Sequence, residues 1–372
     1  MRLALVHDYL IQDGGAERVL RAFAEIWPEA PIFVLFHDRA RWPEFRWRDV
    51  RPSVLQGMPG VLRYYRWTLP MMPAATEHHD LTEFDVVLSS ASAFAKGVVT
   101  RPDALHICYC HTPTRYLWTD THSYLKDLRT NRFIKFILPF VLTSLRMWDR
   151  TSALRVDKFI ANSQTVAGRI KKYYERGSDL IYPPVDCSQF RVAEKVGNYF
   201  LAGGRLVAYK RFDLVIEVFN RLKLPLIIFG TGPYEDRLRK MAGENITFLG
   251  HVSDEEKAKL LSECIAFVHP QLEDFGLLPL EVMASGRPVI ALGRGGALET
   301  VIDGKTGKLF YEQNWETLLD VVLNFKPEDY HSEEIRKWAE QFDLSKFKVR
   351  MKEYVEGAYA EFAGGKQVAR LL

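Results

Sequence analysis

The sequence is poor in cysteine, with four among its 372 residues: Cys108, Cys110, Cys187 and Cys264. So few cysteines give no disulfide framework, which excludes the disulfide-rich secreted classes and indicates a reducing, cytoplasmic compartment. Apolar runs long enough to cross a bilayer are also missing. The longest candidate, residues 133–148, is interrupted by Lys135, Pro139 and Arg146. The apolar stretch at the N-terminus ends at Asp8 and is too short for a secretory signal peptide.

A surplus of charge of one sign is absent as well. Lys and Arg number 50 against 47 Asp and Glu, and the formal net charge of +3 is too small to indicate nucleic-acid binding. The sequence has no Asp-x-Asp pair, an arrangement of carboxylates that holds a divalent ion on a diphosphate. We therefore expect no essential metal and no cofactor. No Gly-x-Gly-x-x-Gly with a following acid stands after the first expected strand, which argues against an NAD dehydrogenase.

What the sequence does contain is an alternation of short apolar runs and amphipathic segments, typical of βα units on a parallel sheet. Five runs of the first half are expected to be strands: residues 3–7, 31–35, 85–89, 106–110 and 158–161. Five more follow in the second half: residues 199–202, 226–229, 246–249, 265–269 and 288–292. Residues 16–27 and 212–222 have the apolar spacing of helices. The fold class is therefore α/β, with two Rossmann-like halves.

The join between the halves lies at Pro183 and Pro184, because two adjacent prolines cannot continue a helix and stiffen the chain. We place an N-terminal domain at residues 1–182 and a C-terminal domain at residues 183–345. Residues 347–362 have apolar side chains at helical spacing. We expect them to form a long helix that packs back on the N-terminal domain.

The most informative segment of the second half contains two glutamates eight residues apart, Glu273 and Glu281. It follows an expected strand and opens a helix, with Pro279 suited to the first turn. The backbone N–H groups of Phe275, Gly276 and Leu277 would then lie at a helix N-terminus, which favours oxyanions. We expect Glu273 to face a reacting group and Glu281 to accept hydrogen bonds from paired ribose hydroxyls. The alternative is a capped helix with two solvated glutamates.

Two cations follow the first strand of the second half, Arg205 and Lys210, in the sequence GGRLVAYKR. Fixed cations in such a loop are suited to neutralising a diphosphate leaving group. In the first half, Gly14 and Gly15 let the backbone approach a ligand at a helix start. His111 ends an expected strand, where ligands meet a parallel sheet. Cys108 and Cys110, on that strand, are expected to pack as small apolar residues rather than to bind metal.

With these residues, the second half resembles the donor-binding domain of glycosyltransferase family 4. The match runs from GGRL through the FGTGP turn and the two-glutamate block to Gly307. The first half is similar through DGGAER at residues 13–18 and CHTPTRY at residues 110–116, the latter resembling bacterial O-antigen and capsule mannosyltransferases. The resemblance implies the GT-B fold, two Rossmann-like domains facing across a cleft, and retaining transfer of a sugar from a nucleotide-sugar donor.

The resemblance also implies roles for particular residues. Glu281 binds the nucleotide ribose, and Arg205 and Lys210 hold the diphosphate. Glu273 holds the donor sugar with the backbone of residues 275–277, and His111 lies near the transferred sugar. Gly14 and Gly15 lie beside the phosphates or the acceptor, although the loop here is Asp-Gly-Gly rather than a longer glycine run. Gly230 and His251 join the donor-binding set.

The expected donor is GDP-mannose, and the expected acceptor is a lipid-linked sugar or an oligosaccharide in surface polysaccharide synthesis. Without a second carboxylate on the acceptor side, front-face attack is favoured over double displacement. A nucleotide-sugar epimerase on the same fold and a non-catalytic nucleotide-sugar-binding protein are the alternatives. Arginines interleaved with aromatic residues at 41–48, 61–67 and 129–150 suggest peripheral contact with an anionic membrane, against the alternative of core helices with solvated arginines.

Overall fold

The computed structural model describes residues 1–12, 14–121 and 132–369. The chain divides into two compact units. Unit 1 comprises Met1–Tyr182 together with Lys348–Leu372, and unit 2 comprises Pro183–Phe347. Each unit has its own parallel β-sheet, so the expected α/β class with two Rossmann-like halves is confirmed.

The sheet of unit 1 has seven strands in the order β3-β2-β1-β4-β5-β6-β7. Their bounds are Leu3–Leu10 (β1), Ile32–His37 (β2), Val50–Pro52 (β3), Val86–Ala91 (β4), Leu105–Cys110 (β5), Lys158–Ala161 (β6) and Asp179–Leu180 (β7). Every pairing is parallel, as in the register of His7 in β1 with Ser90 in β4. The strand order reverses between β1 and β4, the position at which a doubly wound sheet binds ligands.

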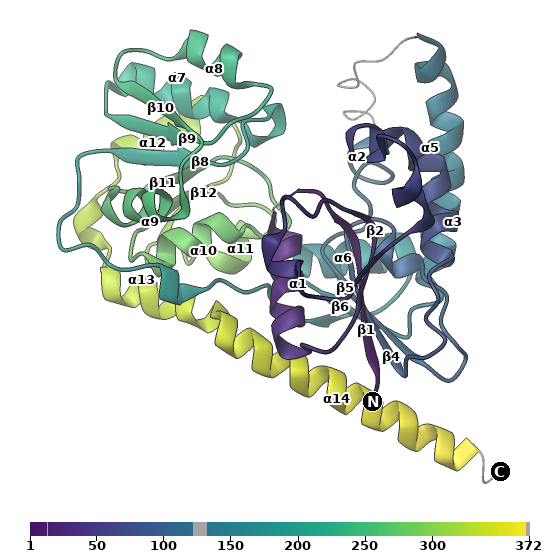
Figure 1. Cartoon of the computed structure of the whole chain (residues 1–372). Coiled ribbons are helices and arrows are strands. Elements are labelled where there is room, and N and C mark those ends of the chain that lie inside the picture. The colour runs from purple at the N-terminus through teal and green to yellow at the C-terminus, as the bar shows by residue number, and fades with distance from the viewer. Residues whose placement is uncertain (13, 122–131, 370–372) are drawn as a thin grey trace. The chain divides into compact units, whose positions relative to one another are not determined.

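Helices cover both faces of this sheet (Figure 1). The helices of unit 1 are Gly15–Ile26 (α1), Val61–Tyr64 (α2), Met72–Glu77 (α3), Arg132–Ala153 (α5), Gln164–Tyr174 (α6) and Leu344–Ala369 (α14, in unit 1 from Lys348), with 3₁₀ turns Pro43–Phe45 (η1), Val54–Gly57 (η2), Tyr65–Met71 (η3) and Ala95–Gly97 (η4). On one face, Cys108 and Cys110 are buried against α6, as expected of small apolar residues. On the other, Phe23 of α1 packs edge-to-face on Tyr109.

The sheet of unit 2 has six strands in the order β10-β9-β8-β11-β12-β13, all parallel. The strands are Phe200–Gly203 (β8), Leu226–Phe229 (β9), Ile246–Gly250 (β10), Phe267–His269 (β11), Val289–Leu292 (β12) and Gly307–Phe310 (β13). The helices are Phe212–Leu222 (α7), Glu235–Met241 (α8), Asp254–Glu263 (α9), Leu277–Ala284 (α10), Ala297–Thr300 (α11), Trp315–Leu323 (α12) and Ser332–Ala339 (α13). Short 3₁₀ turns complete the unit: Cys187–Gln189 (η5), Ala208–Lys210 (η6), Pro327–Asp329 (η7) and Glu340–Phe342 (η8).

The core of unit 2 lies between its sheet and helices α7, α8 and α12. Alternate residues of the strands, such as Ala202, Ile228 and Ile290, face this core, and their neighbours on the opposite face are mostly buried as well. Burial on both faces explains why the strands are nearly continuous apolar runs. The strand order reverses between β8 and β11, so the loops after these two strands are neighbours at one edge.

All ten expected strands are present, but β3, β7 and β13 are additional. These three are short or carry Arg, Asp, Gly or Lys among their apolar residues, which weakens an apolar signal. The C-terminal helix begins at Leu344 and continues to Ala369, beyond the expected bounds of 347–362. Its Tyr354 hydroxyl donates to Asp179 at 2.6 Å, which ties it to β7 of unit 1.

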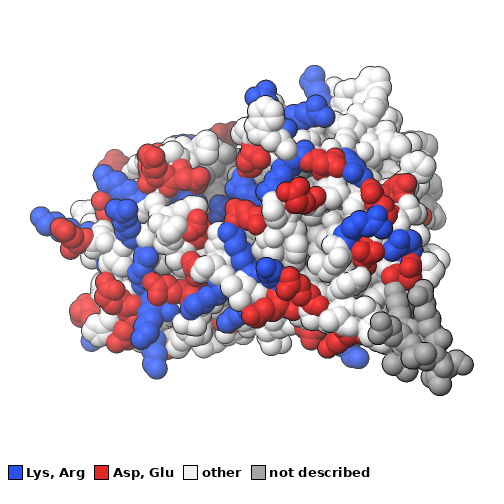
Figure 2. Space-filling view, turned by 60° about the horizontal axis from the view of Figure 1, so that its bottom comes forward, with Lys and Arg blue, Asp and Glu red and all other residues white. Residues whose placement is uncertain are grey.

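Lys and Arg alternate with Asp and Glu over the face shown in Figure 2, where neither sign forms a continuous patch. This distribution agrees with the net charge of +3. Within the described residues, no helix combines the length and the apolar character that crossing a membrane requires.

Candidate functional site

The centre of the site in unit 2 is an ion pair between the loops that follow β8 and β11. Lys210, at the end of the 3₁₀ turn η6, places its Nζ 2.9 Å from Oε1 of Glu273. Both side chains are partly exposed, 14% for Lys210 and 22% for Glu273. The structure therefore joins two residues that the sequence analysis expected on the same ligand, at the edge where the strand order reverses.

Glycines bring the backbone close to this ion pair. Gly204 has φ +117°, and a Cβ at this position would lie 3.3 Å from Nζ of Lys210. Gly230, with φ +106°, approaches so closely that its Cβ would lie 2.0 Å from the carbonyl oxygen of Gly204. A side chain at Gly230 would therefore displace the loop that carries Lys210, because both its backbone conformation and its surroundings require glycine.

The charge of Glu273 is set by its neighbours. Burial would raise the pKa of its carboxyl, but the nearby Lys210 and His269 and hydrogen bonds from Lys210 and Gln271 outweigh burial, so the pKa lies below its ordinary value. His269 Nε2 is 3.9 Å from Oε2 of Glu273. Burial lowers the pKa of His269 to about 4, with Glu273 opposing this shift and Lys210 adding to it. At neutral pH the site therefore holds a carboxylate, an ammonium group and a neutral imidazole.

Helix α10 begins directly after this loop, with Gly276 as its N-cap at φ +91°. Gly276 is required here because a residue with a side chain rarely adopts this conformation. The ring of Phe275 points away into the unit and packs against Phe342, with centroids 5.9 Å apart. Residues 275–277 thus contribute backbone at a helix N-terminus, where unpaired N–H groups and the helix dipole favour an oxyanion.

Glu281 lies within α10 and is almost fully buried, at 3% exposure. Its Oε2 is 3.3 Å from Nζ of Lys257 in α9. Lys257 also lies 3.5 Å from Asp254 of its own helix. Glu281 is therefore held by a cation of a neighbouring helix, and it has a different ion-pair partner from Glu273.

The remaining residues expected to bind the donor lie in exposed positions. Arg205 and His251 are exposed. The backbone N–H of Gly230 donates to the carbonyl of Gly250 at 2.6 Å, which joins the ends of β9 and β10 next to His251. Gly204, Gly230 and the Lys210–Glu273 pair thus form a connected group, while Arg205 and His251 extend from its edge.

In unit 1, His111 lies just beyond the carboxyl end of β5 and is buried to 8% exposure. Its Nε2 is 2.8 Å from the hydroxyl of Ser90 at the end of β4. Gly14 is the N-cap of α1, and Gly15 is the first residue of that helix. Burial, with a smaller contribution from the neighbouring His7, lowers the pKa of His111 to about 3. His111 is therefore neutral at physiological pH.

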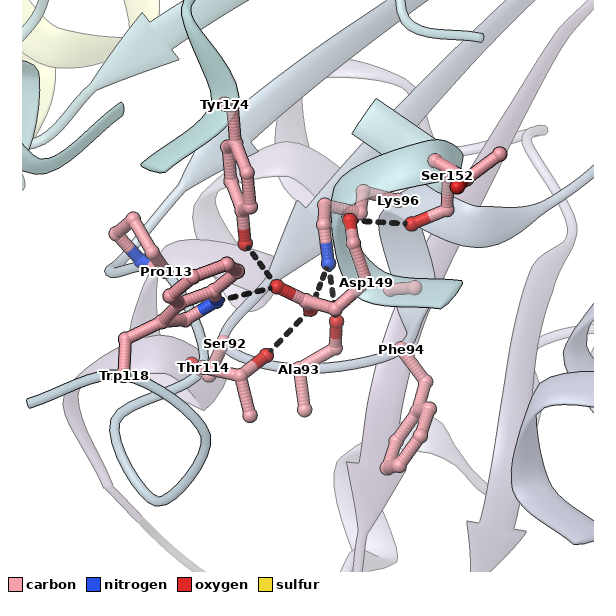
Figure 3. Close-up of polar contacts among 12 residues, drawn as sticks. Ser92, Ala93, Phe94, Lys96, Pro113, Thr114, Trp118, Asp149, Ser152 and Tyr174 are labelled. Carbon is pink, nitrogen blue, oxygen red and sulfur yellow. Dashed lines mark hydrogen bonds and ion pairs between the residues drawn. The ribbon is translucent and has the colours of Figure 1, made fainter. Parts of the chain in front are cut away.

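The segment that follows His111 is anchored by a buried carboxylate that the sequence analysis missed (Figure 3). Asp149 of α5 accepts hydrogen bonds from Thr114 at 2.8 Å, Trp118 at 2.7 Å and Tyr174 at 2.9 Å. Its fourth partner is the ammonium group of Lys96, whose Nζ lies 2.5 Å from Oδ1. Asp149 and Lys96 are each 1% exposed. Four donors on one buried carboxylate fix the segment against α5 and α6, because each donor would otherwise be buried without a partner.

Exposed apolar side chains gather on α2, η3 and α5 of unit 1. We call the set the α2–α5 surface, which comprises Leu62, Tyr64, Trp67, Met71, Phe136, Ile137 and Phe140 with the arginines Arg63 and Arg66. The same segments share a buried core that includes Val61, Met72, Leu142 and Leu145. Figure 1 shows α2 beside α5. The buried residues account for the packing, and the exposed ones form an outer face.

The expected membrane segment at residues 41–48 is wrong in part. Trp42 is 1% exposed, contacts Phe45 and lies under the guanidinium of Arg21, 4.9 Å from its ring centroid. The ring of Trp42 is therefore buried by packing against α1. Of the two tryptophans in this segment, Trp47 is the exposed one. Asp13 and residues 129–131, which belong to two of the expected motifs, lie outside the described residues.

Comparison with known proteins covers nearly the whole chain. Residues 13–189 match the family model described as Glycosyltransferase Family 4, and residues 188–342 match the model described as Glycosyl transferases group 1. The two matches meet at the boundary between the two units.

Several curated relatives are named mannosyltransferases. The chain is 28% identical to the mouse alpha-1,3/1,6-mannosyltransferase ALG2, over 61% of each chain. It is 46% identical to the ALG2 of Dictyostelium discoideum, over 54% of this chain and 57% of the relative. It is 33% identical to the O-antigen chain mannosyltransferase C of Escherichia coli, over 45% of this chain and 48% of the relative. The chain thus spans about half to three-fifths of the length of the curated relatives it matches.

Solved structures share the fold at low sequence identity. HepE of Anabaena in complex with UDP has a TM-score of 0.72 at 17% identity, covering 96% of this chain and all of HepE. The sucrose-phosphate synthase of Thermosynechococcus elongatus has a TM-score of 0.71 at 15% identity, covering 96% of this chain and 99% of the synthase. The likeness confirms the expected GT-B class of fold.

Proposed function

Because the chain belongs to glycosyltransferase family 4, we propose that it transfers mannose from GDP-mannose to a lipid-linked or oligosaccharide acceptor in surface polysaccharide synthesis. The family supports transfer from a nucleotide sugar. The choice of mannose is supported by the names of the relatives in mouse, Dictyostelium discoideum and Escherichia coli. The CHTPTRY segment, with His111 at the end of β5, adds to this choice.

The observation that carries the proposal is the Lys210–Glu273 ion pair. A diphosphate leaving group develops negative charge during transfer, and a fixed ammonium group stabilises it most where water is partly excluded. Lys210 is only 14% exposed and is held beside the glycine backbone at Gly204. Glu273 remains ionised, so it accepts hydrogen bonds from the hydroxyls of the donor sugar. The arrangement provides a cation for the leaving group and an anion for the sugar within one loop pair.

The reaction then proceeds by departure of the diphosphate from the anomeric carbon, which passes through an oxocarbenium-like state. Lys210 and the N-terminus of α10 stabilise the departing anion, and Arg205 extends from the exposed edge of the same loop. The acceptor hydroxyl attacks from the same face and gives its proton to the leaving phosphate. The protein contributes orientation and fixed charge, so no covalent intermediate on Glu273 is required.

The test is transfer from GDP-mannose by Lys210→Ala. We expect kcat/KM to fall at least tenfold, because the variant loses a charge-assisted contact of about 1.5–3 kcal/mol. Lys308→Ala is the matched control, because Lys308 forms a comparable ion pair with Asp303, at 3.1 Å, on the surface of the same unit. Equal activity of the two variants would remove Lys210 from the site.

The proposal includes an anionic membrane as the place where the acceptor is presented. The α2–α5 surface supports this part, because Trp67, Phe136 and Phe140 are each at least 65% exposed. Arg63 and Arg66 of the same surface are exposed as well. Aromatic side chains lie at the level of lipid headgroups and arginines bind anionic headgroups, so the combination fits a peripheral contact.

A further inference from the structure

Four buried polar side chains of unit 1 form a continuous row from α1 to the end of β5. They are Glu17, His7, Ser90 and His111, with exposures of 3%, 3%, 0% and 8%. Glu17 lies in the first turn of α1. His7 and Ser90 lie in the second halves of β1 and β4, and His111 directly follows β5. The row crosses the point between β1 and β4 at which the strand order reverses. Burying four such groups costs free energy unless each is paired.

The hydrogen bonds of this row fix where its protons lie. Nδ1 of His7 is 3.1 Å from the backbone carbonyl oxygen of Ser90 and 3.0 Å from its hydroxyl. A carbonyl oxygen only accepts, so Nδ1 of His7 carries a hydrogen and donates to Ser90. The hydroxyl has a single hydrogen, which is then directed at Nε2 of His111, 2.8 Å away. Nε2 of His111 is therefore an acceptor.

A neutral histidine whose Nε2 accepts must carry its proton on Nδ1. His111 is neutral at physiological pH because burial lowers its pKa to about 3. Its ring is also held from the side, by an edge contact with Tyr109 at a centroid distance of 5.2 Å. The ring thus has a defined tautomer and a defined orientation.

Glu17 completes the row at its other end. Its Oε1 is 3.9 Å from Nε2 of His7, so a carboxylate faces the ring nitrogen that does not contact Ser90. Gly14 leaves the space for this carboxylate, because a Cβ at Gly14 would lie 2.9 Å from Oε2 of Glu17. Besides the expected close approach of a ligand, Gly14 therefore also makes room for the side chain of Glu17.

The row resembles an acid–histidine–serine triad, but Ser90 is not suited to act as a nucleophile. Its side chain is fully buried, and its hydroxyl is engaged by both His7 and His111. His111 is the least buried residue of the row and lies next to the carboxyl edge of the sheet, where ligands of this class of fold bind.

We propose that His7 and Ser90 are positioning residues that hold His111 as the Nδ1–H tautomer, so that Nδ1–H donates a hydrogen bond to an oxygen of the bound sugar. The identity of that sugar rests on the function proposed above, whereas the tautomer does not. The neutral alternative, with the proton on Nε2, would turn the same ring into an acceptor toward the ligand. The Ser90 hydroxyl would then accept from both histidines, and its own hydrogen would have no acceptor at either ring.

The direct test is the ¹⁵N spectrum of the ligand-free full chain labelled at its histidine rings, recorded at neutral pH. The signals of His111 are assigned from those lost in His111→Asn. We expect His111 to show a protonated Nδ1 and an unprotonated Nε2. A protonated Nε2 on His111 would overturn the proposal, whether or not the chain transfers mannose.

A second measurement compares Ser90→Ala with Ser89→Ala. Ser89 is the neighbouring residue of β4, is equally buried, and makes an equivalent hydrogen bond to Nε2 of His106 at 2.8 Å. Ser89→Ala loses one buried serine–histidine hydrogen bond and Ser90→Ala loses two, those to His7 and His111, but only Ser90→Ala releases His111.

We expect Ser90→Ala to lower kcat/KM for GDP-mannose by about three- to tenfold, mainly through kcat, and to change the His111 tautomer signals. Ser89→Ala should change neither, although it also lowers the melting temperature, because a buried serine–histidine hydrogen bond is lost there too. Equal loss of activity in both variants, at equal melting temperatures, would show that Ser90 acts only through stability and would contradict the proposal. Should Ser90→Ala not fold, the spectrum of the unmodified chain still decides.

Discussion

Nζ of Lys210 lies 2.9 Å from Oε1 of Glu273, although the two residues follow different strands of the sheet of unit 2. Strands β8 and β11 are neighbours in that sheet, which is why their loops meet. The pair is partly buried, and Glu273 stays ionised. Removing either partner leaves the other without its counter-charge, so the two residues should behave as one unit in binding.

A double-mutant cycle tests this coupling. Lys210→Met and Glu273→Gln should each weaken the binding of GDP-mannose, and the double variant should lose less than the sum of the two single losses. The coupling energy expected for residues in contact is about 0.5–3 kcal/mol. Calorimetric titration of the four proteins measures it. Additive losses would mean that the ion pair is not part of the donor site.

Glu281 should contribute to donor binding independently of that ion pair. We expect Glu281→Gln to weaken GDP-mannose binding at least tenfold, because a carboxylate that accepts from ribose hydroxyls is lost. Lys257→Met is the control, since it breaks the same Lys257–Glu281 contact but retains the carboxylate. If Lys257→Met weakens binding as much as Glu281→Gln, Glu281 supports the fold of α10 rather than the ribose.

Transfer should not require a divalent metal. The sequence has no Asp-x-Asp pair, and Lys210 is placed to supply the positive charge that a metal would otherwise bring to the diphosphate. Activity measured after dialysis against EDTA should equal that of the untreated protein. Loss of activity on chelation, with recovery on adding magnesium or manganese, would contradict this prediction.

Binding to anionic vesicles should depend on the α2–α5 surface. We expect the unmodified chain to co-sediment with phosphatidylserine-containing liposomes at low salt and to dissociate as salt screens its charges, with a Debye length of about 10 Å at 0.1 M. Changing Arg63 and Arg66 to Ser should abolish about 2 kcal/mol of attraction, at about 1 kcal/mol for each basic residue.

The matched control removes the same charge from unit 2, by changing the exposed Arg237 and Lys240 of α8 to Ser. This variant should bind as the unmodified chain does. A chain that does not bind anionic liposomes at low salt would exclude the lipid surface and leave a soluble acceptor.

Stability should fall in acid because buried histidines are kept neutral in the folded chain. The pKa values of His106 and His111 are lowered to about 3, and that of His269 to about 4, in each case chiefly by burial. An unfolded histidine titrates near 6.5, so below that pH the unfolded chain binds more protons than the folded chain does. Each such histidine should lower the free energy of unfolding by about 1.4 kcal/mol for every unit by which the pH falls between about pH 6.5 and 4.

Urea unfolding followed at several pH values measures this slope. In His106→Asn, the stability of unit 1 should fall less steeply with decreasing pH, because one of its buried histidines is removed. An unfolding midpoint that stays constant from pH 7 to pH 4.5 would contradict the assignment of these histidines as neutral and buried.

Much of the fold could be predicted because its strands are buried on both faces. Residues 158–161, 212–222 and 226–229 have the predicted bounds, since each is a clear apolar run or a helical pattern flanked by turns. Strand β13 was missed because Gly307 and Lys308 interrupt its apolar pattern. Trp42 was assigned to a lipid-facing segment, but its neighbours bury it, which a local pattern of aromatic and basic residues does not reveal.

The candidate site could likewise be predicted from the sequence only in part. Glu273 and Lys210 belong to recognisable loops, so the sequence located them, whereas their pairing depends on the order of strands in the sheet. Asp149 lies near the C-terminal end of the amphipathic helix α5 and has no motif around it. Its role follows from four donors contributed by distant segments, and only the tertiary structure brings those together.

Binding of a nucleotide-sugar donor at Lys210 is tested most directly by the melting temperature of the chain in the presence of a panel of nucleotide sugars. A ligand that binds only the folded chain stabilises it by an amount that grows with the logarithm of its concentration over Kd, about 2.7 kcal/mol at a hundredfold excess. We predict that GDP-mannose raises the melting temperature of the unmodified chain and of Lys308→Ala, and raises that of Lys210→Ala much less. No concentration-dependent rise with any nucleotide sugar, or an equal rise in all three proteins, would contradict it.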